Sequence, residues 1–210
     1  MVKEQIQARG VKDLRVLRAM RKIPREHFLD GASRERAYED RPLSIGHGQT
    51  ISQPYIVARM AELAGIGPDD KVLEVGAGSG YQTAVLAELG RKIYAVDIVP
   101  ALCAHARKRL SELGIGNVEV ECFDGSNGWP DHAPYDAILV AAGAPKVPVI
   151  LLGQLAPGGR FVGPIGARDS QRLVRIVRRG DDFETEYDIS VRFVDLTGRY
   201  GWGGRGPAQA

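Results

Sequence analysis

The sequence is poor in cysteine and in long apolar runs. Its two cysteines cannot build a disulfide framework or a four-thiolate zinc site, and its four histidines show no metal-ligand spacing. No stretch approaches the ~18 apolar residues that a membrane span needs. The first residues, MVKEQIQARGVKDL, lack the apolar core of a signal peptide. We therefore expect a soluble cytoplasmic protein with no metal and no membrane contact.

An excess of charge of one sign is also missing. Twenty-eight Lys and Arg against 26 Asp and Glu give a net charge of +2, which supplies no electrostatic basis for binding nucleic acid. The length of 210 residues suggests one domain. Nothing in the sequence indicates a dedicated interface, so we expect a monomer. Glycine, in contrast, is abundant at 26 residues, which predicts tight turns and places where backbone approaches a ligand.

Strand and helix patterns alternate through the middle of the chain. The predicted strands cover residues 71–78, 92–98, 117–125, 136–143 and 160–166, and the predicted helices cover 81–90, 100–114 and 147–159. This alternation predicts a mostly parallel, doubly wound sheet of the Rossmann-like α/β class. Alternating apolar and polar residues at 171–180 and 183–196 predict an antiparallel hairpin that completes the sheet.

Helical spacing predicts an N-terminal extension before this core, with helices over residues 2–21 and 54–65. Residues 30–55 between them are polar and rich in turn residues, which predicts a long loop, and such loops are often functional. We expect one domain with four parts. They are the N-terminal helices and active-site loop (1–65), the cofactor-binding α/β core (70–166), the C-terminal hairpin (167–200) and a flexible tail (201–210).

The strongest local motif is a strand that ends near Glu74 and enters the loop Gly76-x-Gly78-x-Gly80 before a helix. Glycines there let backbone come close to a ligand. Asp97 ends the next strand, where a carboxylate can accept both hydroxyls of a ribose. The third glycine comes one residue too early for a dinucleotide fingerprint, and Glu74 attracts an ammonium group but repels a pyrophosphate. The set favours S-adenosylmethionine (SAM); a dinucleotide and a purely structural turn remain as alternatives.

Asp124 and Gly125 follow the third predicted strand, at the sheet edge where open α/β folds bind ligands. Asp124 in this position could accept a hydrogen bond from the amine of adenine. The alternative is that Asp124 only caps a helix or a turn.

If SAM donates a methyl group, the motifs that the sequence lacks reduce the number of possible methyl acceptors. Residues 141–145 lack the (Asp/Asn/Ser)-Pro-Pro-aromatic tetrad of amine methylation, neither cysteine follows a proline, and no carboxylate ends the fourth strand to hold a metal. A carboxylate acceptor needs no base and no metal, because its pKa of about 4 leaves it ionised at neutral pH. Hydroxyls of Thr50 and Ser52 in the long loop could orient it. The alternative for Ser52 is a helix cap.

The sequence resembles the protein-L-isoaspartate (D-aspartate) O-methyltransferases of bacteria and archaea over about residues 1–200. The resemblance rests on the segments 23–28, 38–40, 45–54, 72–81, 124–125, 134–138 and 155–160. The run Gly-Gln-Thr-Ile-Ser-Gln-Pro at 48–54 is specific to this family, whereas the glycine loop is shared by many methyltransferases.

The resemblance implies a class I SAM-dependent methyltransferase that methylates the free α-carboxylate of L-isoaspartyl residues in peptides and damaged proteins and releases S-adenosylhomocysteine. The ester then collapses to a succinimide, which starts repair. D-Aspartyl residues stay open as a second substrate. The rival hypotheses are a methyltransferase for a small-molecule carboxylate or hydroxyl and a non-catalytic module with the same fold.

By position, the resemblance makes Ser52 the active-site serine, with a role in orienting the substrate. The cofactor-binding positions it implies, together with the glycines of the loop, are Gln49, Thr50, Ile51, Glu74, Gly76, Gly78, Gly80, Asp97, Asp124, Gly125 and, beside the active site, Thr197. Asp195 stands where the family usually carries proline. His47, between two glycines of the loop, is either a substrate contact or a turn residue.

Overall fold

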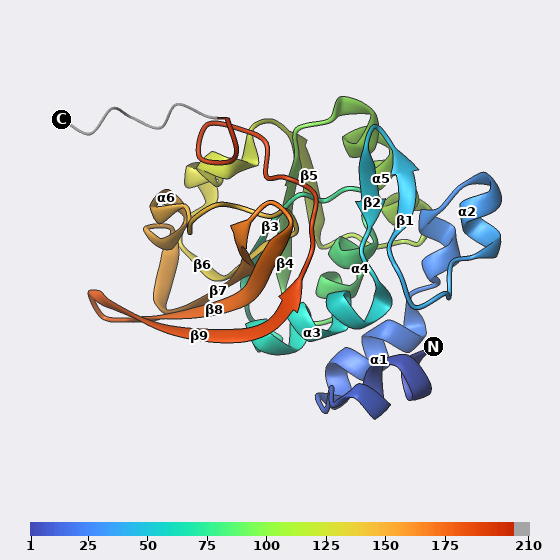
Figure 1. Cartoon of the computed structure of the whole chain (residues 1–210), viewed down its shortest axis with the longest axis horizontal. Coiled ribbons are helices and arrows are strands. Elements are labelled where there is room, and N and C mark those ends of the chain that lie inside the picture. The colour runs from blue at the N-terminus through green and yellow to red at the C-terminus, as the bar shows by residue number, and fades with distance from the viewer. Residues whose placement is uncertain (204–210) are drawn as a thin grey trace.

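The computed structural model describes residues 1–203. A seven-stranded sheet with the order β5-β4-β3-β6-β7-β8-β9 forms its centre (Figure 1). The strands are β3 (Lys71–Val75), β4 (Lys92–Asp97), β5 (Val118–Cys122), β6 (Tyr135–Val140), β7 (Leu155–Ala167), β8 (Ser170–Arg179) and β9 (Asp182–Val191). The five strands β3 to β7 pair in parallel, and β8 and β9 extend the sheet in antiparallel fashion. The predicted mostly parallel sheet with a terminal hairpin is confirmed.

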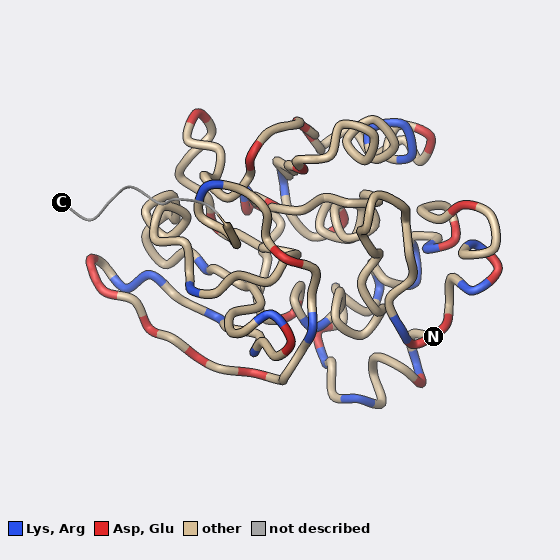
Figure 2. Tube along the Cα trace, turned by 45° about the horizontal axis from the view of Figure 1, so that its top comes forward, with Lys and Arg blue, Asp and Glu red and all other residues tan. Residues whose placement is uncertain are grey.

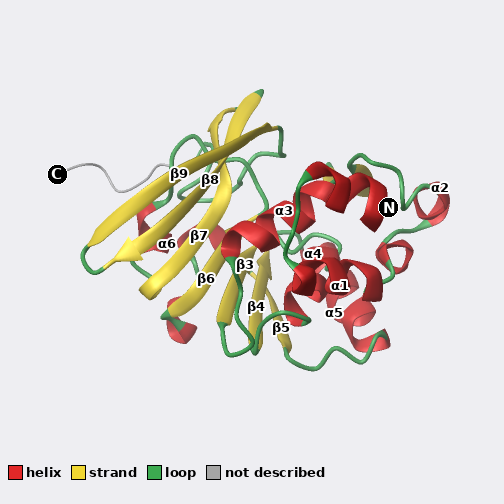
Figure 3. Ribbon diagram, turned by 90° about the horizontal axis from the view of Figure 1, so that it is seen from below, coloured by secondary structure: helices red, strands yellow, loops and turns green. Residues whose placement is uncertain are grey.

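Six α-helices accompany the sheet in the described part of the chain. They are α1 (Leu14–Lys22), α2 (Gly31–Glu35), α3 (Pro54–Ala64), α4 (Tyr81–Ala87), α5 (Pro100–Glu112) and α6 (Val149–Leu152). Single turns of π- or 3-10 helix cover Val2–Ile6, Gln7–Arg9, Arg25–Phe28, Gly125–Asn127 and Pro130–His132. Figure 3 shows α1, α4 and α5 gathered beside the β3-β4-β5 part of the sheet, whereas α6 lies near β7.

Alternate residues of the central strands enter two separate cores. In β3, Val72 packs with α1, α3, α4 and α5, whereas its neighbour Leu73 packs with Trp129, α6 and Leu196 on the opposite face. Residues of β6 alternate in the same way, with Ala137 in the first core and Ile138 in the second. Burial on both faces explains why these strands are mostly apolar.

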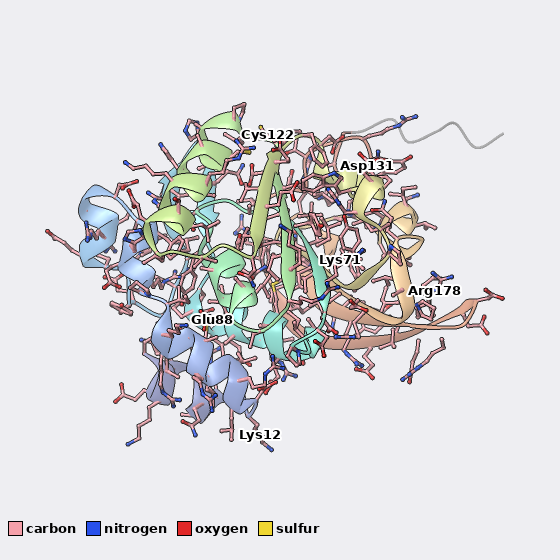
Figure 4. The ribbon with its side chains drawn as sticks, turned by 180° about the vertical axis from the view of Figure 1, so that it is seen from behind. Lys12, Lys71, Glu88, Cys122, Asp131 and Arg178 are labelled. Atoms are coloured by element: carbon pink, nitrogen blue, oxygen red, sulfur yellow. The ribbon has the colours of Figure 1, made fainter. Side chains whose placement is uncertain are left out.

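The parallel strands place their carboxyl ends at one edge of the sheet. Figure 4 labels Cys122 at the carboxyl end of β5 and Lys71 at the amino end of β3. The loops after β3, β4, β5 and β6 therefore meet at a common edge, where open α/β sheets bind their ligands. Along the trace in Figure 2, β8 carries basic residues and its neighbour β9 carries acidic ones.

The prediction of one helix over residues 2–21 is wrong in its middle. Gly10 adopts a left-handed φ of 98° that ends the first helical turns. The chain restarts as α1, where Asp13 is the N-cap and its side chain accepts hydrogen bonds from the backbone amides of Arg15 and Val16. Leu14, which follows the apolar spacing of Val11, Leu17 and Met20 in the predicted helix, is 70% exposed. Glycine adopts this left-handed conformation without strain, and the Asp13 cap begins a new helix. Together they break the continuous helix that the apolar spacing predicts.

The predicted loop at residues 30–55 contains regular structure. Besides α2, it holds a two-stranded antiparallel sheet of β1 (Leu43–Gly46) and β2 (Gln49–Ile51). His47 and Gly48 connect the two strands with φ values of 53° and 69°. Two successive positive φ values are those of the tight hairpin turns that match strand twist. His47 is therefore a turn residue.

Two further expectations need correction. The helix predicted over residues 147–159 is only the four-residue α6, and β7 already begins at Leu155. Gly159 permits this because a Cβ there would lie 2.8 Å from the carbonyl oxygen of Ala156. In the expected tail, the indole of Trp202 donates a 2.9 Å hydrogen bond to the carbonyl of Gly143. The remainder of the predicted tail, residues 204–210, lies outside the described residues.

Candidate active site

The glycine loop leaves β3 and returns as α4. Gly76, Gly78 and Gly80 have φ values of 90°, 52° and 88°, which side chains rarely adopt. The amide of Gly76 donates to the carbonyl of Val96 at 2.8 Å, which fixes the loop to the end of β4. These three positive φ values are compatible with the prediction that the backbone of the glycine loop comes close to a ligand.

Asp97 ends β4 and holds the same loop from its side chain. Its Oδ2 accepts a 2.8 Å hydrogen bond from the amide of Gly78, and its Oδ1 accepts a 2.9 Å bond from the amide of Val99. The residue is 8% exposed. A carboxylate has about four acceptor positions, so each oxygen retains capacity for a ligand hydroxyl.

Glu74 lies in the centre of β3 and is fully buried. Thr83 donates a 2.5 Å hydrogen bond to its Oε2, whereas its Oε1 has no partner among the described residues. Burial raises the pKa of Glu74 to about 8, and the hydrogen bond from Thr83 opposes that rise. The carboxyl is therefore mostly protonated at neutral pH.

These loops enclose a small space of about 50 Å³, which we call the inner cavity. Its lining is Gln49, residues 75–76, 96–99, 125–126, Ala142 and residues 195–197. Four of the predicted cofactor positions other than Thr197 are among them, namely Gln49, Gly76, Asp97 and Gly125. Gly78, Gly80 and the buried Glu74 lie outside the lining.

Asp124 is engaged by the protein itself. It is the N-cap of the turn Gly125–Asn127, and its Oδ1 accepts hydrogen bonds from the amide and the hydroxyl of Ser126. Its Oδ2 accepts a 2.7 Å bond from the amide of Arg199. The capping alternative for Asp124 is thus present in the structure, and Asp124 does not line the inner cavity.

A larger cavity of about 700 Å³, the outer cavity, lies on the other side of β2. Its lining is Arg9, Pro42, Thr50, residues 52–53, Ile56, Arg168 and residues 189–195. The hydroxyl of Ser52 has no hydrogen-bond partner within residues 1–203, and α3 begins after Gln53 without any side-chain cap. The alternative that Ser52 caps this helix is therefore not what the structure shows.

Two segments form walls of both cavities. In β2, Gln49 lines the inner cavity and Thr50 lines the outer one, whereas Ile51 is buried in the core. In the segment after β9, Asp195 lines both cavities and Thr197 lines the inner one. The predicted Ser52 and Thr50 therefore line the outer cavity, whereas the predicted Thr197 lines the inner one.

Asp195 forms an isolated β-bridge with Gly143. Its neighbours bond to Gly143, whose amide donates to the carbonyl of Val194 at 2.7 Å and whose carbonyl accepts from the amide of Leu196 at 2.8 Å. The backbone amide of Asp195 has no part in this pairing, so a proline at this position would remove none of its hydrogen bonds. The Asp195 carboxylate instead accepts a 2.8 Å bond from Arg168.

Comparisons with known proteins agree with this geometry. The family model described as protein-L-isoaspartate(D-aspartate) O-methyltransferase matches residues 1–201. The chain belongs to this family. Protein-L-isoaspartate O-methyltransferase 2 of Pelobacter propionicus is 53% identical over 204 residues, covering 96% of this chain and 91% of that protein. The corresponding enzyme 1 of Rhodopseudomonas palustris is 54% identical over 209 residues, covering 99% and 85%.

Solved structures of the family share the fold. A protein-L-isoaspartate O-methyltransferase superposes with a TM-score of 0.85 at 32% identity, covering 96% of this chain and 67% of the other. A Plasmodium falciparum chain of that description, in complex with S-adenosyl-L-homocysteine, gives a TM-score of 0.79 at 25% identity and covers 93% and 96%. The predicted family and the class I methyltransferase fold are confirmed.

Sequence reasoning missed several lining residues of the two cavities. Ile98, Val99 and Ser126 directly follow predicted site residues at the carboxyl edge of the sheet, so the topology could have indicated them. Arg9 and Arg168 carry no local motif and reach the outer cavity only through the tertiary fold. Within residues 1–203, no group of three or more His, Cys, Asp or Glu could hold a metal ion, and no helix is long and apolar enough to cross a membrane.

Proposed function

We propose that this chain transfers a methyl group from SAM to the free α-carboxylate of L-isoaspartyl residues in peptides and damaged proteins. The observation that carries the proposal is the position of Ser52. Ser52, whose hydroxyl has no hydrogen-bond partner among the described residues, lines the outer cavity, and Gln49, three residues earlier in β2, lines the inner cavity. Such a hydroxyl can orient the substrate carboxylate toward the methyl donor without neutralising the negative charge of the carboxylate.

The inner cavity is the proposed cofactor site. Asp97 offers carboxylate oxygens to ribose hydroxyls, and the left-handed backbone of the glycine loop allows close approach. Glu74, predicted to attract the ammonium group of the cofactor, is buried next to this loop and does not line the inner cavity. When bound, SAM supplies a methyl group activated by its sulfonium.

The size of the inner cavity sets a further requirement. Ligand pockets for molecules of this size measure about 300–1,000 Å³, which is several times the 50 Å³ found here. Asp97 belongs to the central sheet and the glycine loop is bonded to its β4 strand, whereas Gln49 and residues 195–197 lie outside this sheet. We expect the latter two segments to separate when the cofactor enters.

Methyl transfer to a carboxylate requires few further groups from the protein. With a pKa of about 4, the acceptor carboxylate is already ionised at neutral pH and needs no general base. The chain must hold one carboxylate oxygen in line with the departing group. The hydroxyls of Ser52 and Thr50 suit this role because a neutral donor reduces the nucleophilicity of the oxygen less than a guanidinium does.

The same proposal extends to the remaining sequence predictions. Residues 1–200 act as one methyltransferase domain, and the protein works as a monomer in the cytoplasm on protein substrates, without nucleic acid or membranes. The methyl ester leaves the enzyme and closes to a succinimide when the neighbouring backbone nitrogen displaces methanol. Hydrolysis of the succinimide returns part of the material to normal aspartyl residues.

A pair of synthetic peptides tests the proposal. One carries an isoaspartyl residue, and its twin carries normal aspartate at the same position. Each is incubated with the purified chain and methyl-labelled SAM, and volatile methanol is collected after base treatment. Labelling of the isoaspartyl peptide alone supports the proposal. Labelling of neither peptide contradicts it, and labelling of small carboxylic acids in preference to both would favour the small-molecule alternative.

A further inference from the structure

Gln171 is a buried polar side chain close to the outer cavity. It lies at the start of β8 and is 1% exposed. Its Nε2 donates hydrogen bonds to the carbonyls of Ala167 at 2.5 Å and Arg168 at 2.7 Å, in the turn between β7 and β8. Its Oε1 accepts a 2.9 Å bond from the backbone amide of Phe193.

The hydrogen bond from Phe193 to Gln171 anchors residues 192–197, which follow β9 and are not paired in the central sheet. The ladder between β8 and β9 ends where Gln171 pairs with Val191. Beyond that point, residues 192–197 leave the sheet and line the two cavities. The side-chain amide of Gln171 replaces the next backbone partner and continues the hydrogen bonding past the end of the ladder.

The opposite side of this segment is held by Gly143, which bonds to Val194 and Leu196. Gly143 also packs on the amide of Gln171, because a Cβ at Gly143 would lie 3.1 Å from its Cδ. Arg168, whose carbonyl accepts from Gln171, pairs through its own side chain with Asp195 of the segment. The contacts of Gln171 therefore reach the segment directly and through the β7–β8 turn.

We infer that Gln171 is a positioning residue for the peptide substrate. It fixes residues 192–195, which line the outer cavity together with Ser52, and it acts through them without lining the cavity itself. The inference rests on the proposed function, since its kinetic readout is methylation of a peptide. Small displacements of a binding wall can cost about tenfold or more in rate or affinity.

The chain offers a matched control in Gln154. This side chain is 7% exposed, and its Oε1 accepts a 2.9 Å bond from the amide of Trp129 while its Nε2 donates a 2.9 Å bond to the carbonyl of Asn127. It therefore bridges backbone segments in the same manner as Gln171, but at a place that does not line the outer cavity. Methionine preserves the volume of glutamine and removes its hydrogen bonds.

Steady-state kinetics and thermal unfolding of Gln171→Met and Gln154→Met test the inference. We expect both variants to lose a similar few degrees of Tm, about 3–10 °C, for the lost buried hydrogen bonds. Only Gln171→Met should raise the KM for the isoaspartyl peptide, by about tenfold, with the KM for SAM within about twofold of the parent. Equal peptide KM values in the two variants would overturn the inference.

Two further measurements keep the outcome decisive. Gly143→Ala displaces the Gln171 amide without removing it and should raise the peptide KM by a smaller factor, which covers the case in which Gln171→Met does not fold. Hydrogen exchange at the Phe193 amide should accelerate in Gln171→Met and not in Gln154→Met. If the parent chain methylates no isoaspartyl peptide, the proposed function fails, and the exchange experiment alone then decides on Gln171.

Discussion

Replacing Glu74 by glutamine should remove a pH dependence of stability that arises from a buried carboxyl in β3. The pKa of Glu74 is raised from 4.5 to about 8 because the carboxyl is fully buried, with a hydrogen bond from Thr83 opposing the rise. The folded protein therefore binds a proton that the unfolded chain releases between these two values. This contribution to stability is complete below about pH 4.5 and is lost as the pH rises through about 8.

The magnitude follows from the two pKa values. At about 1.36 kcal/mol per pKa unit, the full contribution has a ceiling of about 5 kcal/mol. Between about pH 5.5 and 7.5, proton linkage from this one group lowers the unfolding free energy by about 2.5 kcal/mol. Glu74→Gln keeps the shape and an oxygen for Thr83 but has no proton to exchange, so its unfolding free energy lacks this decline.

Urea unfolding followed by tryptophan fluorescence at a series of pH values measures the effect. The informative quantity is the difference in unfolding free energy between parent and Glu74→Gln, which cancels the other titrating groups. That difference should shift by about 2.5 kcal/mol between about pH 5.5 and 7.5, with the parent losing ground as the pH rises. Glu35→Gln, at an exposed carboxylate, is the control. Parallel pH profiles for the parent and Glu74→Gln would refute the reasoning.

Three further substitutions test the rest of the site. Ser52→Ala should lower kcat for an isoaspartyl peptide by about 10²-fold while the Kd for SAM in isothermal titration changes little, because the hydroxyl acts on the acceptor; unchanged turnover would contradict this role. Asp97→Asn should weaken SAM binding by about tenfold in the same titration, since hydrogen bonds to a charged acceptor are stronger, and an unaltered Kd would count against the ribose assignment. Gly125→Ala should lower the urea unfolding free energy by about 1–3 kcal/mol, because a Cβ would lie 2.4 Å from Cγ2 of Val96. Gly116→Ala, with nothing within 4 Å, is its control and should be nearly neutral.

The central fold was predictable because its signals are local and strong. Strand β6 is apolar at nearly every position, and the glycines after β3 specify one backbone path. The boundaries that failed depend on single contacts. Gly10 ends a helix that apolar spacing would continue, and Gly159 lets β7 begin early because its missing side chain admits the carbonyl of Ala156.

The candidate site was predictable in part for the same reason. Asp97 and Gly125 follow strands whose direction places them at one edge, and both line the inner cavity. Asp124 carries an equally suggestive position, yet its oxygens accept from Ser126 and Arg199, and a bond between residues 75 positions apart has no local signature. Gln171 was missed because a lone glutamine in an alternating strand looks like any polar residue.

The residues proposed to bind the cofactor and those proposed to bind the methyl acceptor come largely from different parts of the fold. The glycine loop and Asp97 belong to the Rossmann-like core, which many methyltransferases share. The walls of the outer cavity, the proposed acceptor site, include Thr50 of β2, in a separate two-stranded sheet, and residues 192–195 beyond the last strand. Neither wall is held by the central ladder, so its position depends on side chains such as Gln171 and on the pairing with Gly143. Changes in these outer contacts should therefore alter peptide binding while leaving the cofactor-binding core intact.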